Sequence, residues 1–453
     1  MTDRYKIKLS TTHIIMFSFL GVILLGSFLL YLPISSANGS SVSYTDALFT
    51  STTSTCVTGL VTLPTVSTWS PFGQAVILCL IQIGGLGVIT VMSGFMLLLH
   101  RRMGIGGSLL LQDAFNLNSL SGLVKFVGTA VKGTFIIEGI GALLYMFVFV
   151  PEFGVRGVWI SVFTSVSAFC NAGIDIIAEN SLCNYSANPI INIVTCVLIV
   201  LGGIGFIVWW DILRVMKIKS KLRKRFFESL TLHSKITIVT TLILIFAGAT
   251  LIFFFEYNNA QTMKDYTLFQ KIQASFFQSV TTRTAGFATI PQENLTDSTS
   301  IVSMLLMFVG GSPVGTAGGI KTVTFAVIIV AALAPISNKE DTEMFGRRIR
   351  KQAVSKAVAV TFMAFFTVFI STLLLSLVTK ADMLDILYET VSAAATVGLS
   401  RGFTSSLDTV GKLIIIFTMY LGRVGPISLA LALNKKKDNQ SIIRNPKEEI
   451  TVG

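Results

Sequence analysis

The stretch AAATVGLS, residues 393–400, places a glycine directly after a short apolar run that ends in threonine and valine. Three other stretches end in the same way: TCVTGL at 55–60, FCNAGI at 169–174 and TRTAGF at 282–287. Their glycines, residues 59, 173, 286 and 398, are separated by 114, 113 and 112 residues. Ten positions before each glycine stands an aromatic residue: Phe49, Phe163, Phe276 and Tyr388. This regular spacing predicts four tandem repeats.

Each repeat contains the same three segments. A long apolar segment comes first, at residues 14–33, 125–150, 234–256 and 354–378. A shorter, half-polar segment follows, at 44–58, 157–171, 268–284 and 382–396. A second apolar segment closes the repeat, at 73–99, 189–213, 301–333 and 410–433. The short segments cannot cross roughly 30 Å of hydrocarbon, so we expect eight transmembrane helices and four re-entrant helices.

The composition indicates a polytopic membrane protein. Only 13% of the 453 residues are charged and 52% are hydrophobic, whereas soluble domains carry about 25% charged residues. Lysine and arginine gather at the N-terminus, at 100–104, 214–227 and 338–356, and in the C-terminal tail. Short cytoplasmic loops collect such residues, so both termini are expected to be cytoplasmic. Lipid headgroups explain these basic segments better than a nucleic acid does.

The pattern assigns one repeat to each quarter of the chain. The predicted boundaries are 1–100, 101–217, 218–336 and 337–453. Because irregular backbone cannot face lipid, the four glycine loops are expected to meet at a water-filled centre, where inward carbonyls replace the hydration shell of a monovalent cation. The chain offers no cluster of acids, histidines or nucleophiles in one repeat, so neither an enzyme nor an organic cofactor is predicted. Five cysteines without a CxxC pair are expected to be free thiols.

In its four repeats and their glycine stretches, the chain resembles the superfamily of K+ transporters that includes bacterial Trk, bacterial Ktr and plant HKT proteins. Its length is most similar to the Ktr-type membrane subunit (KtrB-like). The resemblance implies an all-α fold with four M1–P–M2 repeats around a single central pore. It also implies K+ uptake across the bacterial plasma membrane through a selectivity filter. The implied filter residues are Val57, Thr58, Gly59, Asn171, Ala172, Gly173, Thr284, Ala285, Gly286, Thr396, Val397 and Gly398.

The third closing segment contains MFVGGSPVGTAGGIKTV, residues 307–323. Glycine and proline weaken a helix interior, so the sequence predicts a break at 310–319. By resemblance this intramembrane loop is a gate. The gate residues are Gly310, Gly311, Ser312, Pro313, Val314, Gly315, Thr316, Ala317, Gly318 and Gly319, with Lys321 and Arg423. Arg423 lies inside the last apolar segment, where an arginine usually faces a cavity or a partner.

The resemblance implies two partners, a second copy of the chain and a cytosolic ring of nucleotide-binding (RCK-domain) regulatory subunits. Only the fourth repeat contains TVG, the start of the channel motif TVGYG, so Na+ passage and Na+ dependence stay open. A Na+-permeable or Na+-coupled symporter is the alternative. Symporters usually have two inverted halves, and four parallel repeats argue against that class. Glu138 in the second outgoing segment is expected to be a packed, hydrogen-bonded carboxylate.

Overall fold

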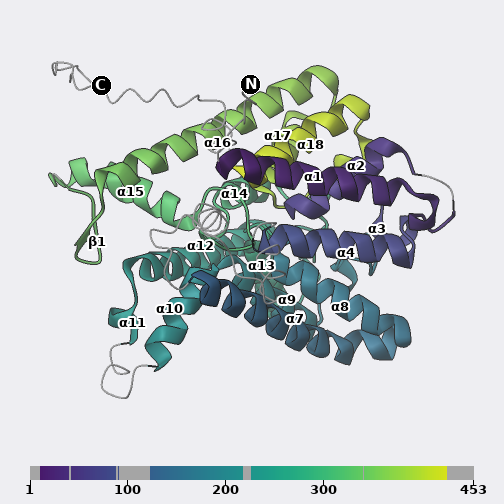
Figure 1. Ribbon diagram of the computed structural model, residues 1–453, viewed down its shortest axis with the longest axis horizontal. Coiled ribbons are helices and arrows are strands. Elements are labelled where there is room, and N and C mark those ends of the chain that lie inside the picture. The colour runs from purple at the N-terminus through teal and green to yellow at the C-terminus, as the bar shows by residue number, and fades with distance from the viewer. Residues whose placement is uncertain are drawn as a thin grey trace, which may run out of the picture.

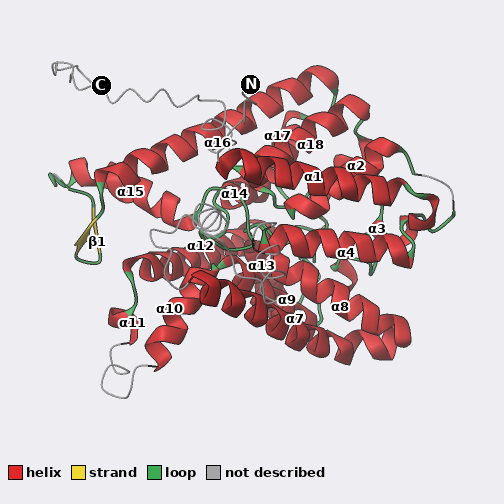
Figure 2. Cartoon of the chain, in the orientation of Figure 1, coloured by secondary structure: helices red, strands yellow, loops and turns green. Residues whose placement is uncertain are grey.

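A computed structural model describes residues 11–39, 42–87, 90, 123–217, 226–339 and 341–425. Helices dominate this part of the chain, and its one strand pair is a small hairpin, β1 (Glu343–Met344) with β2 (Arg347–Arg348) (Figure 2). The N-terminal basic residues, the basic segment at 100–104 and the C-terminal tail lie outside the described residues, as do the first two repeat boundaries in part.

Four long apolar helices match the four predicted outgoing segments. They are α1 (Thr11–Tyr31), α7 (Leu123–Phe153), α12 (Leu232–Glu256) and α16 (Lys351–Val378). Among the described residues these four are long and apolar enough to cross a membrane, and a bent pair adds a fifth candidate. The predicted total of eight transmembrane helices therefore stays a prediction.

Four short helices match the predicted half-polar segments. They are α2 (Tyr44–Cys56), α8 (Val155–Cys170), α13 (Leu268–Thr281) and α17 (Met383–Ala395). Three of them begin with a side-chain cap: Ser43, Thr267 and Asp382 each accept a hydrogen bond from a backbone amide of the first turn. Each of the four packs against the long helix that precedes it.

The closing segments are shorter helices than expected. They begin as α4 (Pro71–Leu86), α9 (Pro189–Gly203), α14 (Asp297–Phe308) and α18 (Thr409–Val424). The second continues as α10 (Phe206–Lys217) after a bend of 93°, and the third continues as α15 (Thr322–Ile336) after a loop. A break was expected in the third segment alone, so the bend at Ile204 and Gly205 corrects the straight helix predicted for 189–213.

The remaining elements lie at the two ends of the long helices. β1, α10 and α11 (Phe226–Ser229) lie at one end in Figure 1, and α3 (Thr65–Thr68) lies at the other. Short 3-10 turns complete the loops: η1 (Pro33–Ser35), η2 (Cys183–Tyr185), η4 (Gln292–Asn294) and η5 (Thr404–Ser406).

One hydrogen bond recurs between the outgoing and short helices. The hydroxyl of Ser51 donates to the carbonyl of Ile23 at 2.7 Å, and that of Ser165 to the carbonyl of Glu138 at 2.6 Å. Ser279 donates to the carbonyl of Ile245 at 2.7 Å. In the fourth repeat two hydroxyls, Thr372 and Thr390, pair at 2.7 Å. These contacts align the short helices of the four repeats, and the three hydroxyl-to-carbonyl bonds also align the outgoing helices of the first three repeats, at Ile23, Glu138 and Ile245.

The equivalent positions correct one sequence alignment. Phe49, Phe163 and Tyr388 are fully buried, but Phe276 is 36% exposed and its neighbour Phe277 is fully buried. The reason is a shorter third turn. In the other repeats the residue before the glycine donates to a carbonyl five positions back, as Thr58 does to Thr53, whereas Ala285 donates only four back, to Thr281. Phe277 is therefore the buried aromatic of the third repeat.

Candidate functional site

After each short helix, a residue with a positive φ angle lies two positions before the glycine. The turn residues are Val57, Asn171, Thr284 and Thr396, with φ angles of 56°, 60°, 72° and 52°. Three of the four are β-branched, and such residues rarely adopt a positive φ. A strained conformation repeated at four equivalent places is held by its surroundings and marks a functional site.

Hydroxyl groups of the short helices hold these turns. Gly59 donates its amide to the Thr53 hydroxyl at 2.9 Å, and Gly398 donates to the Ser392 hydroxyl at 3.0 Å. In the second repeat the Ser167 hydroxyl donates to the carbonyl of Ile174, and in the third the Thr281 hydroxyl donates to that of Phe287, both at 2.6 Å. The sequence analysis missed these hydroxyls, although three of them stand six residues before a glycine.

The four glycines form a closed ring. Their φ angles are 103°, 64°, 83° and 94°, a region that side chains disfavour. A Cβ atom on Gly59 would lie 2.5 Å from the carbonyl oxygen of Ala172. Equivalent atoms would meet the oxygen of Ala285 from Gly173, that of Val397 from Gly286, and that of Thr58 from Gly398. Each glycine thus faces the turn of the next repeat, and the fourth faces the first. All twelve predicted filter residues therefore lie in turns that surround one centre.

A cavity opens on one side of this ring. It has a volume of about 520 Å³ and is lined by all four glycines. Its walls carry three carboxylic acids, Asp175, Glu179 and Glu293. Burial raises the pKa of Asp175 to about 6, against opposing hydrogen bonds from Ser181 and two backbone amides. Asp175 is two residues after Gly173 and was not singled out from the sequence.

The turn residues pack against the glycine clusters of the closing helices. A Cβ on Gly84 would lie 2.8 Å from Val57 Cγ2, and one on Gly310 would lie 2.9 Å from Thr284 Cγ2. On Gly422 it would lie 3.1 Å from Thr396 Cγ2. The glycines of the closing helices therefore leave room for the turn side chains, which explains why each closing segment carries them.

The predicted loop at 310–319 lies within an irregular stretch between α14 and α15. It crosses to the second repeat, where Ser312 and Thr316 donate their amides to the carbonyls of Gly203 and Gly202, at 2.8 and 3.2 Å. Phe206, the first residue of α10, donates to the carbonyl of Val314 at 3.0 Å. Ser312 and Thr316 are fully buried. These hydrogen bonds satisfy backbone carbonyl and amide groups at the bend between α9 and α10, where the regular hydrogen bonds of a helix are interrupted.

The loop also contacts the turns that end α8 and α17. The Thr316 hydroxyl donates to the carbonyl of Phe169 at 3.2 Å, beside Asn171. A Cβ on Gly318 would meet the Thr396 hydroxyl and lie 2.7 Å from the carbonyl oxygen of Ala395. The loop therefore lies against the ends of α8 and α17, on the side of the turns that carries the closing helices.

Three cationic side chains hold the loop. Arg423 donates to the carbonyls of Thr316 and Gly84, both at 2.5 Å, and so joins the loop to the first repeat. Lys321 donates to the carbonyl of Ala317 at 2.6 Å, within the loop itself. Arg283 donates to the carbonyl of Gly310 at 3.1 Å. Arg283 was not among the gate residues chosen from the sequence, because nothing local indicates its bond to the loop.

Comparisons with known proteins identify the family of the chain. The family model of the TrkH cation transport proteins matches residues 4–444. The potassium/sodium uptake protein NtpJ of Enterococcus hirae is 37% identical over 100% of this chain and 99% of that protein. The Ktr system potassium uptake protein B of Bacillus subtilis is 36% identical over 99% of this chain and 98% of that protein.

A solved structure supports the fold alone. The crystal structure of the potassium transporter TrkH from Vibrio parahaemolyticus aligns with a TM-score of 0.75 and 15% sequence identity. The alignment covers 96% of this chain and 87% of that one.

Proposed function

The chain belongs to the TrkH family of cation transport proteins, and from this we propose that it takes up K+ through a single pore at the centre of its four repeats. The family expected from the glycine stretches is confirmed, and the chain is a multi-pass membrane protein. The relatives that it matches are transport proteins, and we propose no enzymatic activity for it.

The closed ring of glycines is the observation that carries this proposal. The carbonyls of Thr58, Ala172, Ala285 and Val397 each lie against the glycine of a neighbouring turn. Carbonyl rings of this kind replace the water around K+. The short helices direct the partial negative charge of their C-terminal ends to the same centre, which favours a cation further. K+ is the transported ion in this proposal, and no organic cofactor takes part.

We further propose that the loop at 310–319 is the gate and Arg423 its latch. The loop lies against the turns, and the guanidinium group of Arg423 joins it to the first repeat by two hydrogen bonds. A positive charge at this place also repels cations while the loop is closed. Withdrawal of the loop would break backbone hydrogen bonds to Gly202 and Gly203, so opening needs an external source of free energy.

That source, in this proposal, is a cytosolic ring of nucleotide-binding RCK-domain subunits that binds a homodimer of this chain. The basic segments are the proposed cytoplasmic surface, with both termini inside the plasma membrane. Similarity to a protein named for the Ktr system supports a multi-subunit arrangement. Four fused repeats complete the pore, so each chain of the dimer would conduct independently.

Na+ passage is the second candidate function. The turns differ in sequence, and among their turn residues only Thr284 and Thr396 share a side chain. The Enterococcus hirae relative carries both ions in its name. A filter with unequal walls discriminates less sharply between cations of similar size. Na+ dependence of K+ uptake belongs to the same candidate.

Growth at low K+ tests the proposed function. The chain would be expressed in a bacterium that lacks its own K+ uptake systems, with and without a Ktr-type cytosolic regulator. We expect growth at micromolar to millimolar K+ only when the chain is present. Failure to grow in both arms, with the protein verified in the membrane, would reject K+ uptake as its function.

A further inference from the structure

A carboxyl group lies behind the second filter turn. Glu138 is midway along α7, equally far from Leu123 and Phe153, and its side chain is 4% exposed. A carboxyl at the centre of a membrane helix is costly, so it usually has a partner and a functional role. Neither the ring of carbonyls nor the gate, as described above, makes use of it.

This carboxyl occurs in one repeat of the four. In the first and third repeats the equivalent positions, defined by the hydroxyl contacts of the short helices, are Ile23 and Ile245, and the fourth outgoing helix, Lys351–Val378, contains no acidic residue. The packing between the outgoing and short helices therefore does not need an acid. The reason for an acid in the second repeat must therefore lie in the groups that surround the Glu138 side chain.

Those surroundings are Cys170 and Gln82. The Cys170 sulfur lies 3.8 Å from Glu138 Oε1 and 3.9 Å from Gln82 Oε1. Gln82 belongs to α4 of the first repeat, and its side chain lies beside the same carboxyl. A Cβ on Gly85 would lie 2.5 Å from the Cys170 sulfur, so the thiol is pressed against α4. The cluster joins the first repeat to the second.

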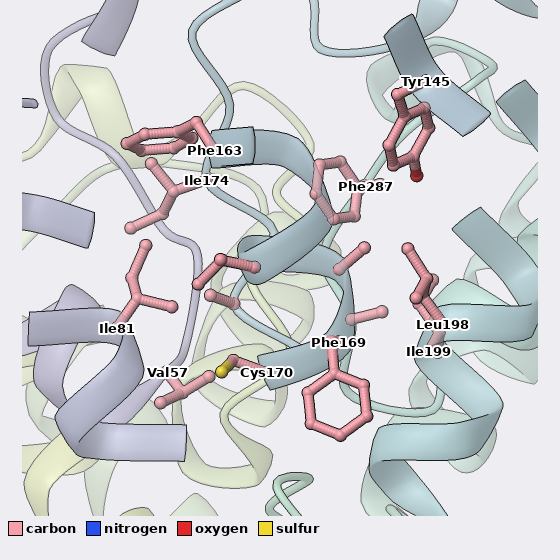
Figure 3. Packing of buried hydrophobic residues seen from close by; sticks show 14 of the residues in the cluster. Val57, Ile81, Tyr145, Phe163, Phe169, Cys170, Ile174, Leu198, Ile199 and Phe287 are labelled. Atoms are coloured by element: carbon pink, nitrogen blue, oxygen red, sulfur yellow. The ribbon is translucent and has the colours of Figure 1, made fainter. Parts of the chain in front are cut away.

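Cys170 links this cluster to the filter. It is the last residue of α8, and the next two residues are Asn171 and Ala172. The carbonyl of Ala172 is the one that faces Gly59 in the ring. Figure 3 shows Cys170 and Val57, the turn residue of the first repeat, among the packed side chains of one core. A shift at Cys170 would therefore move one of the four carbonyls.

We propose that Glu138 is a positioning residue for the second filter turn. Its carboxyl oxygen accepts a hydrogen bond from the Cys170 thiol, and this contact holds the end of α8 against α4 and fixes the carbonyl of Ala172 in the ring. This inference rests on the proposed K+ uptake. It assigns to one acidic side chain an effect on ion affinity and selectivity that packing alone would not produce.

The test compares ion affinity with maximal rate. Rb+ uptake per chain in the membrane would be measured for Glu138→Gln, Cys170→Ala and the double variant, each with Na+ as competitor. Glu138→Gln should raise the half-saturating Rb+ concentration roughly fivefold, which corresponds to about 1 kcal/mol, with the maximal rate changed less than about twofold. Cys170→Ala should act similarly, and the double variant should be no worse than either single one.

Two matched controls separate position from folding. Glu256→Gln removes a fully buried carboxylate from the third outgoing helix, where four groups donate to it, and Cys196→Ala removes a buried thiol from α9. Both should leave Rb+ affinity unchanged. If Glu138→Gln does not reach the membrane, the difference in Rb+ affinity between Cys170→Ala and Cys196→Ala provides the test instead.

Unchanged Rb+ affinity in Glu138→Gln would overturn the proposal. If that variant does not reach the membrane, unchanged Rb+ affinity in Cys170→Ala would overturn it. Independent effects that multiply in the double variant would overturn it too, because the Glu138 carboxyl would then not act through the thiol. A wild-type chain without Rb+ uptake would instead count against the proposed transport function.

Discussion

Replacement of Gly59 by serine would disturb the ring of glycines at one defined place. The new Cβ would lie 2.5 Å from the carbonyl oxygen of Ala172 and 3.2 Å from Gly398 Cα, both too close for an ordinary contact. The backbone at φ 103° is also unfavourable for any side chain. The turn must therefore move, and with it the carbonyl of Thr58.

The expected loss of K+ affinity follows from the close contacts of the new Cβ and from the unfavourable backbone angle. Strain at a disfavoured φ is on the order of 1–3 kcal/mol, and relief of it by movement of the turn removes carbonyl contacts from the ion. Since about 1.4 kcal/mol is a factor of ten, we expect K+ affinity to fall at least about tenfold and Na+ to compete better. Uptake of Rb+ against rising K+ and Na+ measures both.

Gly39→Ser is the matched control. Gly39 also has a positive φ, 68°, but nothing lies within 4 Å of the Cβ that serine would add. This variant carries the backbone strain without the clash in the ring, so its K+ affinity should equal that of the wild type. If Gly59→Ser keeps wild-type affinity and selectivity as well, the reasoning from the ring is refuted.

Deletion of residues 312–317 should raise maximal uptake and weaken its dependence on the cytosolic partner, and Arg423→Ala should do so less strongly, because it removes the hydrogen bonds to Thr316 and Gly84. Lower uptake by a correctly inserted deletion variant would make the loop structural. Asp175 has a pKa of about 6 and becomes neutral below it, so K+ affinity should weaken between pH 7 and pH 5, a dependence that Asp175→Asn should lack. Burial raises the pKa of the Cys183 thiol, which lines the cavity beside the ring of glycines, to about 12. Because the thiolate is the reactive form, a cationic methanethiosulfonate reagent should block uptake slowly, and the rate of block should rise about tenfold for each pH unit. A rate of block that does not depend on pH would contradict this.

Much of the site could be predicted from sequence because its residues are local. Each filter turn is a stretch of a few residues, and the glycines mark positions where the backbone adopts a positive φ. The break after Phe308 was likewise visible as a run of glycines and a proline. The four-repeat organisation is a prediction from spacing, and the four long and four short helices are consistent with it.

The errors had two sources, one local turn of unexpected length and several contacts between distant segments. Phe276 was chosen by counting back from Gly286, but the third turn is one residue shorter, which a hydrogen bond from Ala285 to Thr281 reveals. The loop's bonds to Gly202 and Gly203, and the bend that follows them, join residues more than 100 positions apart. Arg283 and Asp175 gained their roles from the same three-dimensional arrangement, which no local pattern encodes.

The most direct test of the single pore is Rb+ uptake into proteoliposomes that contain the purified chain, with serine placed in turn at Gly59, Gly173, Gly286 and Gly398. The account predicts saturable uptake in which K+ competes at far lower concentration than Na+. Each of the four variants should weaken competition by K+, because each glycine faces a carbonyl of the next turn. If serine at only one or two of these positions changes ion competition, the four turns do not form one filter.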